Sequence, residues 1–96
     1  MVVFEGVVWE YAGEAPWYFI SLPAYESELI RERVPRGPGF GSVKVTVRIG
    51  ATTWNTSVFP DKARGVYVLP VKRSIRDAEG LGPGVLASVE LKIELD

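Results

Sequence analysis

Residues 43–49 (VKVTVRI) alternate apolar and polar side chains at every position. Because successive side chains of a β-strand point to opposite faces, this pattern predicts a strand with its valines toward a core and Lys44 and Arg48 toward water. Gly50-Ala51 then forms a turn, and residues 52–59 (TTWNTSVF) are rich in β-branched and aromatic residues. The centre of the chain is therefore expected to be a half-buried β-hairpin.

The same reasoning predicts strands at residues 2–11, 17–22, 65–71 and 85–95. The segment 17–22 (WYFISL) is apolar at nearly every position, which indicates burial on both faces. Pro70 cannot donate a ladder hydrogen bond, so it must lie at an edge, a bulge or the end of its strand. One face of the last strand carries Val85, Ala87, Val89, Leu91, Ile93 and Leu95.

Residues 24–34 (AYESELIRERV) carry apolar residues four positions apart, which predicts a helix over about 24–34. Pro23 suits the first turn of a helix, where its missing N–H costs nothing. The Pro- and Gly-rich residues 35–39 end the helix.

A short helical turn is expected at about 75–79, with Ser74 as its N-cap and Gly80 closing it. Six short antiparallel strands with one helix predict the all-β class, as a small closed six-stranded antiparallel barrel, because closure removes exposed sheet edges. Residues 1–96 are expected to form one domain, since either half would be too small to bury a core.

The chain contains no His and no Cys. This excludes zinc sites built on those residues, iron–sulfur clusters, disulfides, thiol catalysis and triads that use His. Carboxylates and Lys are still available, so an enzyme stays open, but no spacing singles out a catalytic pair. We therefore assign no catalytic residue, no metal site and no cofactor.

The start of the chain has no cationic stretch, and no apolar run approaches the ~18 residues that span a bilayer. We expect a cytoplasmic protein with no membrane partner.

Charge is distributed unevenly along the chain. Residues 1–30 have a net charge of −5, residues 31–76 of +8 and residues 77–96 of −4. A basic middle between acidic ends can form an anion-binding surface. It can equally reflect cross-strand pairing of acidic terminal strands with basic central ones.

Residues 72–76 (KRSIR) form the densest basic stretch and lead into the predicted helical turn. They suit an anion site, although a solvated turn with locally paired bases is the alternative. Aromatic residues on the strands can stack rings of bases or sugars, or can belong to the core. The candidate ligand-binding residues are Trp54, Asn55, Ser57, Tyr67, Lys72, Arg73 and Arg76.

Several segments together resemble one known family. The elements Trp-x-x-Ser-x-Phe-Pro at 54–60 and Tyr-x-Leu-Pro-Val-Lys at 67–72 occur in order with segments 17–23, 39–45 and 76–81. Together they resemble the family catalogued as domain of unknown function 1905. The resemblance implies a barrel of the double-split type with a helix packed across an opening, and it implies no established activity. Gly82-Pro83-Gly84 stands where the family commonly has Gly-Asp.

The leading hypothesis is a non-enzymatic cytoplasmic binding module for an anionic small molecule or a protein partner. One alternative is a single-stranded nucleic-acid-binding barrel, against which a pI of about 5.5 argues. Another is a structural or oligomerisation domain, which an exposed apolar patch on the 17–22 strand would favour. The sequence leaves both a monomer and a homodimer open.

Overall fold

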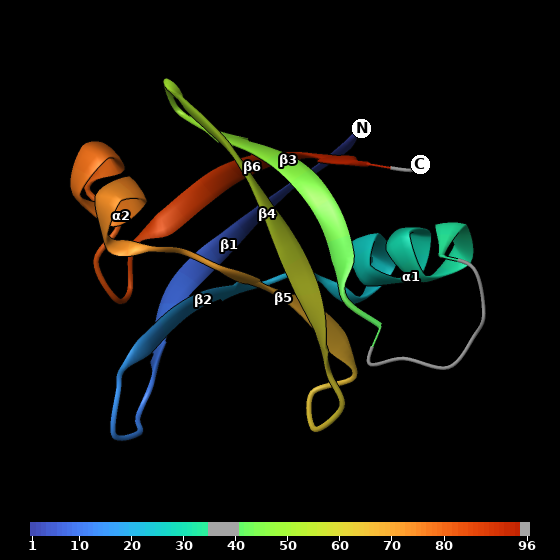
Figure 1. The fold of residues 1–96 in the computed structure, drawn as a ribbon, viewed down its shortest axis with the longest axis horizontal. Coiled ribbons are helices and arrows are strands. Elements are labelled where there is room, and N and C mark those ends of the chain that lie inside the picture. Colours follow the sequence, from blue (N-terminus) through green and yellow to red (C-terminus); the bar gives the residue numbers. More distant parts are fainter. Residues whose placement is uncertain (35–40, 95–96) are drawn as a thin grey trace.

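A computed structural model describes residues 1–34 and 41–94 of the chain. Within these residues six strands close into an antiparallel barrel in the order β1-β2-β5-β4-β3-β6 (Figure 1). This confirms the predicted fold class. In chain order the elements are β1 (Val2–Tyr11), β2 (Trp17–Ser21), α1 (Ala24–Arg33), β3 (Val43–Ile49), β4 (Thr52–Asp61), β5 (Val66–Pro70), α2 (Arg73–Glu79) and β6 (Leu86–Ile93).

The two longest strands are each shared between two neighbours. The first six residues of β1 pair with β6 and its last four with β2. In the same way β4 pairs first with β3 and then, from Phe59, with β5. At Gly6, two residues before β1 changes partner, an added Cβ would lie 2.5 Å from Cγ2 of Ile20, so only glycine fits. This sharing is the double-split arrangement that the family resemblance implies.

Alternating side chains of the strands fill the barrel. The apolar residues of β3 are buried, whereas Lys44 and Arg48 between them are exposed, as predicted. From β6, Val89 and Leu91 are fully buried beside them. Burial of each such side chain contributes about 1.5–3 kcal/mol, so the inward faces of the strands supply most of the favourable energy of folding.

Helix α1 packs across one opening of the barrel, and α2 lies on the opposite side of the barrel, at the left in Figure 1. Ile30 of α1 is fully buried, and so is the hydroxyl-bearing Ser27. Oγ of Ser27 accepts the backbone N–H of Tyr67 at 3.0 Å and donates to the carbonyl of Leu22 at 3.4 Å. In the described part of the chain, neither helix has the length and apolar character needed to cross a bilayer.

Helix α1 starts at Ala24 as predicted, and its end differs from the prediction by one residue. Pro23 is the N-cap and not part of the first helical turn, with ψ of 164°. The helix ends at Arg33, because Val34 has an extended conformation with φ −90° and ψ 130°. Val34 precedes Pro35 in the sequence, and a residue before proline is pushed out of the helical region. The predicted stop at 35–39 lies outside the described residues.

Helix α2 is longer than predicted and starts earlier. It begins at Arg73, and Ser74 is not its cap. The carbonyl of Lys72 accepts the N–H groups of both Ile75 and Arg76 at 3.1 Å, which makes Lys72 the N-cap. The prediction that Gly80 closes the helix is confirmed, with a left-handed φ of 66°.

The prediction that β2 is buried on both faces is wrong. Trp17 is 57% exposed, because no described part of the chain packs over the outward side of the barrel wall at that point. Strand β4 runs two residues further than predicted, to Asp61, and Pro70 lies at the end of β5, one of its allowed places. Strand β6 starts at Leu86, so Val85 lies before it, and Leu95 lies outside the described residues.

Candidate functional site

Five of the seven candidate residues line one hollow of about 550 Å³ on the barrel surface. The hollow lies where β2, β4 and the start of α2 meet. We call it the basic hollow, and its main lining residues are Trp17, Tyr18, Trp54, Asn55, Phe59, Lys72, Arg73 and Arg76.

Arg76 is held in place at the edge of the basic hollow. Its guanidinium carbon lies 3.8 Å from the centre of the Tyr18 ring, and Nη1 donates to the carbonyl of Val71 at 2.7 Å. Both contacts fix a planar cation against an aromatic face. The positive charge therefore has a defined position beside the hollow.

Lys72 and Arg73 are exposed at the same hollow. Nε of Arg73 lies 3.7 Å from Oδ2 of Asp77, and both side chains are mostly solvent-exposed, so this ion pair is weak. Among the described residues that line the basic hollow there is no carboxylate. An anion in the hollow would therefore meet three cations without a lining acid to repel it.

Two candidate residues lie elsewhere. Tyr67 is 5% exposed and belongs to the core, with Arg31 over its ring at 5.8 Å. Ser57 lines a separate hollow with Lys44 and Glu94, to which Asn55 also contributes. The structure thus brings five candidates together and leaves two apart.

Cross-strand charge pairing explains part of the uneven charge distribution. Nε of Arg48 on β3 lies 2.5 Å from Oε2 of Glu90, the residue opposite it on β6. The other ion pairs of the described residues join groups on the same element or turn. Pairing between strands therefore accounts for Arg48 but not for the bases at the basic hollow.

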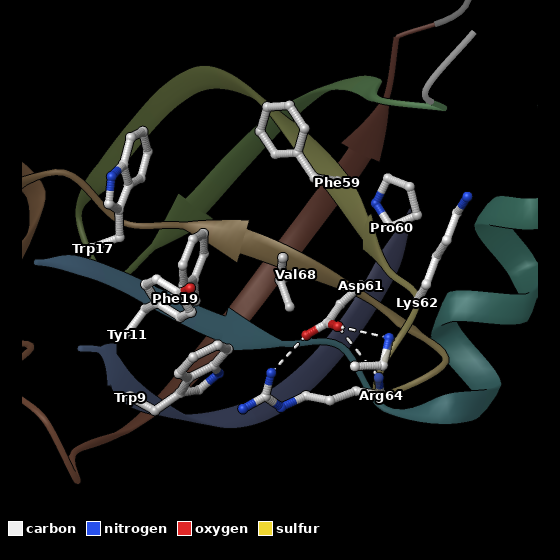
Figure 2. Close-up of a pocket in the computed structure, with 11 residues that line it drawn as sticks. Trp9, Tyr11, Trp17, Phe19, Phe59, Pro60, Asp61, Lys62, Arg64 and Val68 are labelled. Atoms are coloured by element: carbon white, nitrogen blue, oxygen red, sulfur yellow. Dashed lines mark hydrogen bonds and ion pairs between the residues drawn. The ribbon is translucent and has the colours of Figure 1, made fainter. Parts of the chain in front are cut away.

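A second hollow of about 610 Å³ lies on the outer face of the barrel, over β1, β2, β4 and β5 (Figure 2). We call it the aromatic hollow, after the rings that line it. Val68 lies in its wall, and Phe59 and Pro60 of β4 lie across it from Trp9 (Figure 2). Its lining residues are Trp9, Tyr11, Trp17, Phe19, Phe59, Pro60, Asp61, Lys62, Ala63, Arg64 and Val68.

Four of these rings follow from the register of β1 and β2. Trp9 is opposite Phe19, and Tyr11 is opposite Trp17, and residues two apart on a strand share a face. The Trp9 and Phe19 rings lie 5.1 Å apart, and the Phe19 and Trp17 rings lie 6.0 Å apart and nearly parallel at 8°. Nε1 of Trp9 donates to Oγ of Ser21 at 2.9 Å. The rings therefore form a fixed aromatic wall.

Arg64 closes one end of the aromatic hollow. Its guanidinium carbon lies 4.2 Å from the centre of the Trp9 ring, and Nη1 donates to Oδ2 of Asp61 at 2.7 Å. The other oxygen of Asp61 accepts the backbone N–H groups of Ala63 and Arg64. The hydrogen bond from the Arg64 side chain is the main reason that the pKa of Asp61 lies below its ordinary value. Asp61 therefore stays ionised at neutral pH and holds the turn and Arg64 in place.

Sequence reasoning did not place Phe19 or Phe59 at a site. The available signal was the spacing of Trp9 with Tyr11 and of Trp17 with Phe19, which puts aromatic residues on one face of two neighbouring strands.

A model of the family described as "Domain of unknown function (DUF1905)" matches residues 4–91. The matched range includes every residue that lines the two hollows. No curated protein matches the chain.

Proposed function

The chain belongs to the DUF1905 family, and from this premise we propose that it is a non-enzymatic cytoplasmic binding module whose basic hollow takes an anionic small molecule. One observation carries the proposal: Lys72, Arg73 and Arg76 line a single hollow whose described lining residues include no carboxylate.

The chemistry of the basic hollow suits a phosphate or a carboxylate. The guanidinium of Arg73 and the ammonium of Lys72 are exposed and can donate charge-assisted hydrogen bonds to such oxygens. The Asn55 amide supplies a neutral donor, and the hollow's volume of about 550 Å³ is within the range of small-molecule sites. Because the cations are exposed, affinity is expected to fall as salt rises.

The proposal is tested by thermal unfolding with phosphate, pyrophosphate, ribose 5-phosphate and citrate at low salt. An anion present at 100 times its Kd should add about 2.7 kcal/mol, a shift of several degrees in a domain of this size. The double variant Lys72→Gln/Arg73→Gln should lose this shift. Arg33→Gln/Lys92→Gln removes the same charge away from the hollow and should keep it. Wild-type shifts in the Lys72/Arg73 variant, or no shift with any of the four anions, would overturn the proposal.

A second candidate function, self-association, is supported by the exposure of Trp17 on β2. Tyr11, which is opposite Trp17 on β1, is also exposed, and adjoining exposed apolar side chains are what favours assembly. Sedimentation equilibrium across protein concentrations tests it: a dimer that Trp17→Ala dissociates would support self-association, and a monomer at all concentrations would exclude it.

A further inference from the structure

The basic hollow and the aromatic hollow share one wall. Trp17 and Phe59 line both of them. Trp17 is 57% exposed, so a ligand can reach its ring without displacing any part of the core. A molecule resting on Trp17 is therefore next to the cations of the basic hollow.

The aromatic wall is not needed to fill the core. Its rings project from the outer face of β1 and β2, whereas Val8 and Ile20 of the same two strands point inward and are buried. Tyr11 is 56% exposed beside Trp17. Exposed rings that lie next to one another on a fixed wall offer flat apolar area to a planar group of a ligand.

The charges of the described lining residues favour an anion in both hollows. The aromatic hollow has Lys62 and Arg64, and the only carboxylate among its described lining residues is Asp61, which Arg64 already pairs. The basic hollow, which Trp17 also lines, adds Lys72 and Arg73. A suitable ligand thus has a planar ring and a negatively charged group that are joined by a short covalent linker.

We propose that the two hollows together form one site for a nucleotide unit, with the base stacked on Trp17 and the phosphate held by Lys72 and Arg73. This inference rests on the proposed function and names its ligand class. A sugar phosphate supplies the charge without the ring, and a neutral aromatic molecule supplies the ring without the charge. Every base has a π-face, so stacking binds all four bases without selecting among them.

A nucleotide unit can come from a free nucleotide or from a single strand of nucleic acid. Both present the same base and phosphate to the site. They differ in the number of phosphates engaged, and therefore in how steeply affinity depends on salt. The experiment includes both sources.

The test compares Kd values, by calorimetry, for ribose 5-phosphate, adenosine 5′-monophosphate and a short single-stranded oligonucleotide. Stacking of one base is expected to make the mononucleotide bind about tenfold more tightly than the sugar phosphate. Trp17→Ala should abolish this advantage and leave the affinity for ribose 5-phosphate unchanged, whereas Trp17→Phe should keep part of it. Tyr25→Ala removes an aromatic residue that is 70% exposed on α1, lies outside both hollows, and should change neither Kd.

Each outcome decides the inference. Equal affinities for ribose 5-phosphate and the mononucleotide would overturn it and leave the proposed function standing. Failure of the mononucleotide and of the oligonucleotide to bind would also overturn it, and the proposed function would then be decided by the four anions of its own test. Tighter binding of the mononucleotide than of ribose 5-phosphate, abolished by Trp17→Ala, supports the inference. If the affinity for the oligonucleotide then falls more steeply with salt than the affinity for the mononucleotide, the single strand is the source. If the oligonucleotide and the mononucleotide bind with equal affinity, the free nucleotide is the source. A dimer that occupies the Trp17 face and excludes nucleotides would also overturn it.

Discussion

The guanidinium carbon of Arg76 lies 3.8 Å from the centre of the Tyr18 ring, so a cation–π contact joins α2 to β2. The same side chain donates to the carbonyl of Val71. One residue thereby positions the helix that carries Arg73 and completes one side of the basic hollow.

Arg76→Ala should lower the free energy of unfolding by about 1–3 kcal/mol, because it removes both the stacked cation and a charged hydrogen bond. Arg76→Lys should recover part of the loss, since Lys keeps the charge but not the planar group. Urea denaturation measures both. Arg73→Ala, at an exposed position, should stay within about 0.5 kcal/mol of wild type. Equal stability of the two alanine variants would contradict the role given to Arg76.

Ser27→Ala should cost about 1–3 kcal/mol, because it leaves the buried backbone N–H of Tyr67 without its acceptor. Ser74→Ala is the matched control, since Ser74 is exposed and does not cap α2. A loss of about 1 kcal/mol at Ser74 would instead show that it acts as an N-cap. Both variants can be measured by denaturation in urea.

Asp61 should stabilise the protein in a pH-dependent way. Its pKa in the folded state lies below its ordinary value, mainly because of the hydrogen bond from Arg64. The carboxylate therefore stabilises the fold fully above about pH 4, and this contribution is lost as pH falls through the lowered pKa. The stability gap between wild type and Asp61→Asn should accordingly be larger at about pH 7 than at about pH 2.5. In an Arg64→Ala background the gap should change less with pH than in the wild-type background, because only the backbone N–H groups of residues 63 and 64 still donate to Asp61. A gap that is independent of pH in the wild-type background would refute the assignment.

Substitutions at Gly50 and Gly65 distinguish the cost of a positive φ alone from the added cost of a steric collision. Both have positive φ, of 59° and 72°, but only at Gly50 would an added Cβ collide with another group, the Glu79 carboxylate. Gly65→Ala should cost about 1–2 kcal/mol for the backbone alone. Gly50→Ala should cost more, because Glu79 must move and give up its hydrogen bond from Thr52. Thermal or urea unfolding compares them, and equal losses would mean that Glu79 moves freely.

Much of the fold could be predicted from local patterns. The alternation at 43–49 identifies both the strand and its buried face, because one side of that strand meets the core and the other meets water. The end of α2 was predictable from Gly80, whereas its start was not, since the Lys72 carbonyl begins the helix without any side-chain signal. The burial of β2 was also not predictable, because an apolar run does not say whether its outer face is covered.

The candidate site also contains some residues that the sequence could identify and others that only the folded barrel brings together. Lys72, Arg73 and Arg76 were identifiable because they are close in the sequence. Ser57 and Tyr67 were included for their strand positions, but the orientation of each depends on the register of β4 and β5 within the closed barrel. Register also brings Phe59 and Trp17, two residues that are distant in sequence, to the same hollows.

The pairing of β1 with β6, which closes the barrel, also joins the two ends of the described chain. Val2 is paired with Leu91, so this ladder requires a loop that encloses almost the whole chain. Such long-range pairing slows folding, typically to milliseconds or seconds. During synthesis β6 is made after the other strands, and until it is made β1 and β3 each have an unpaired edge. A nascent chain of this barrel is thus most prone to aggregate just before its last strand leaves the ribosome.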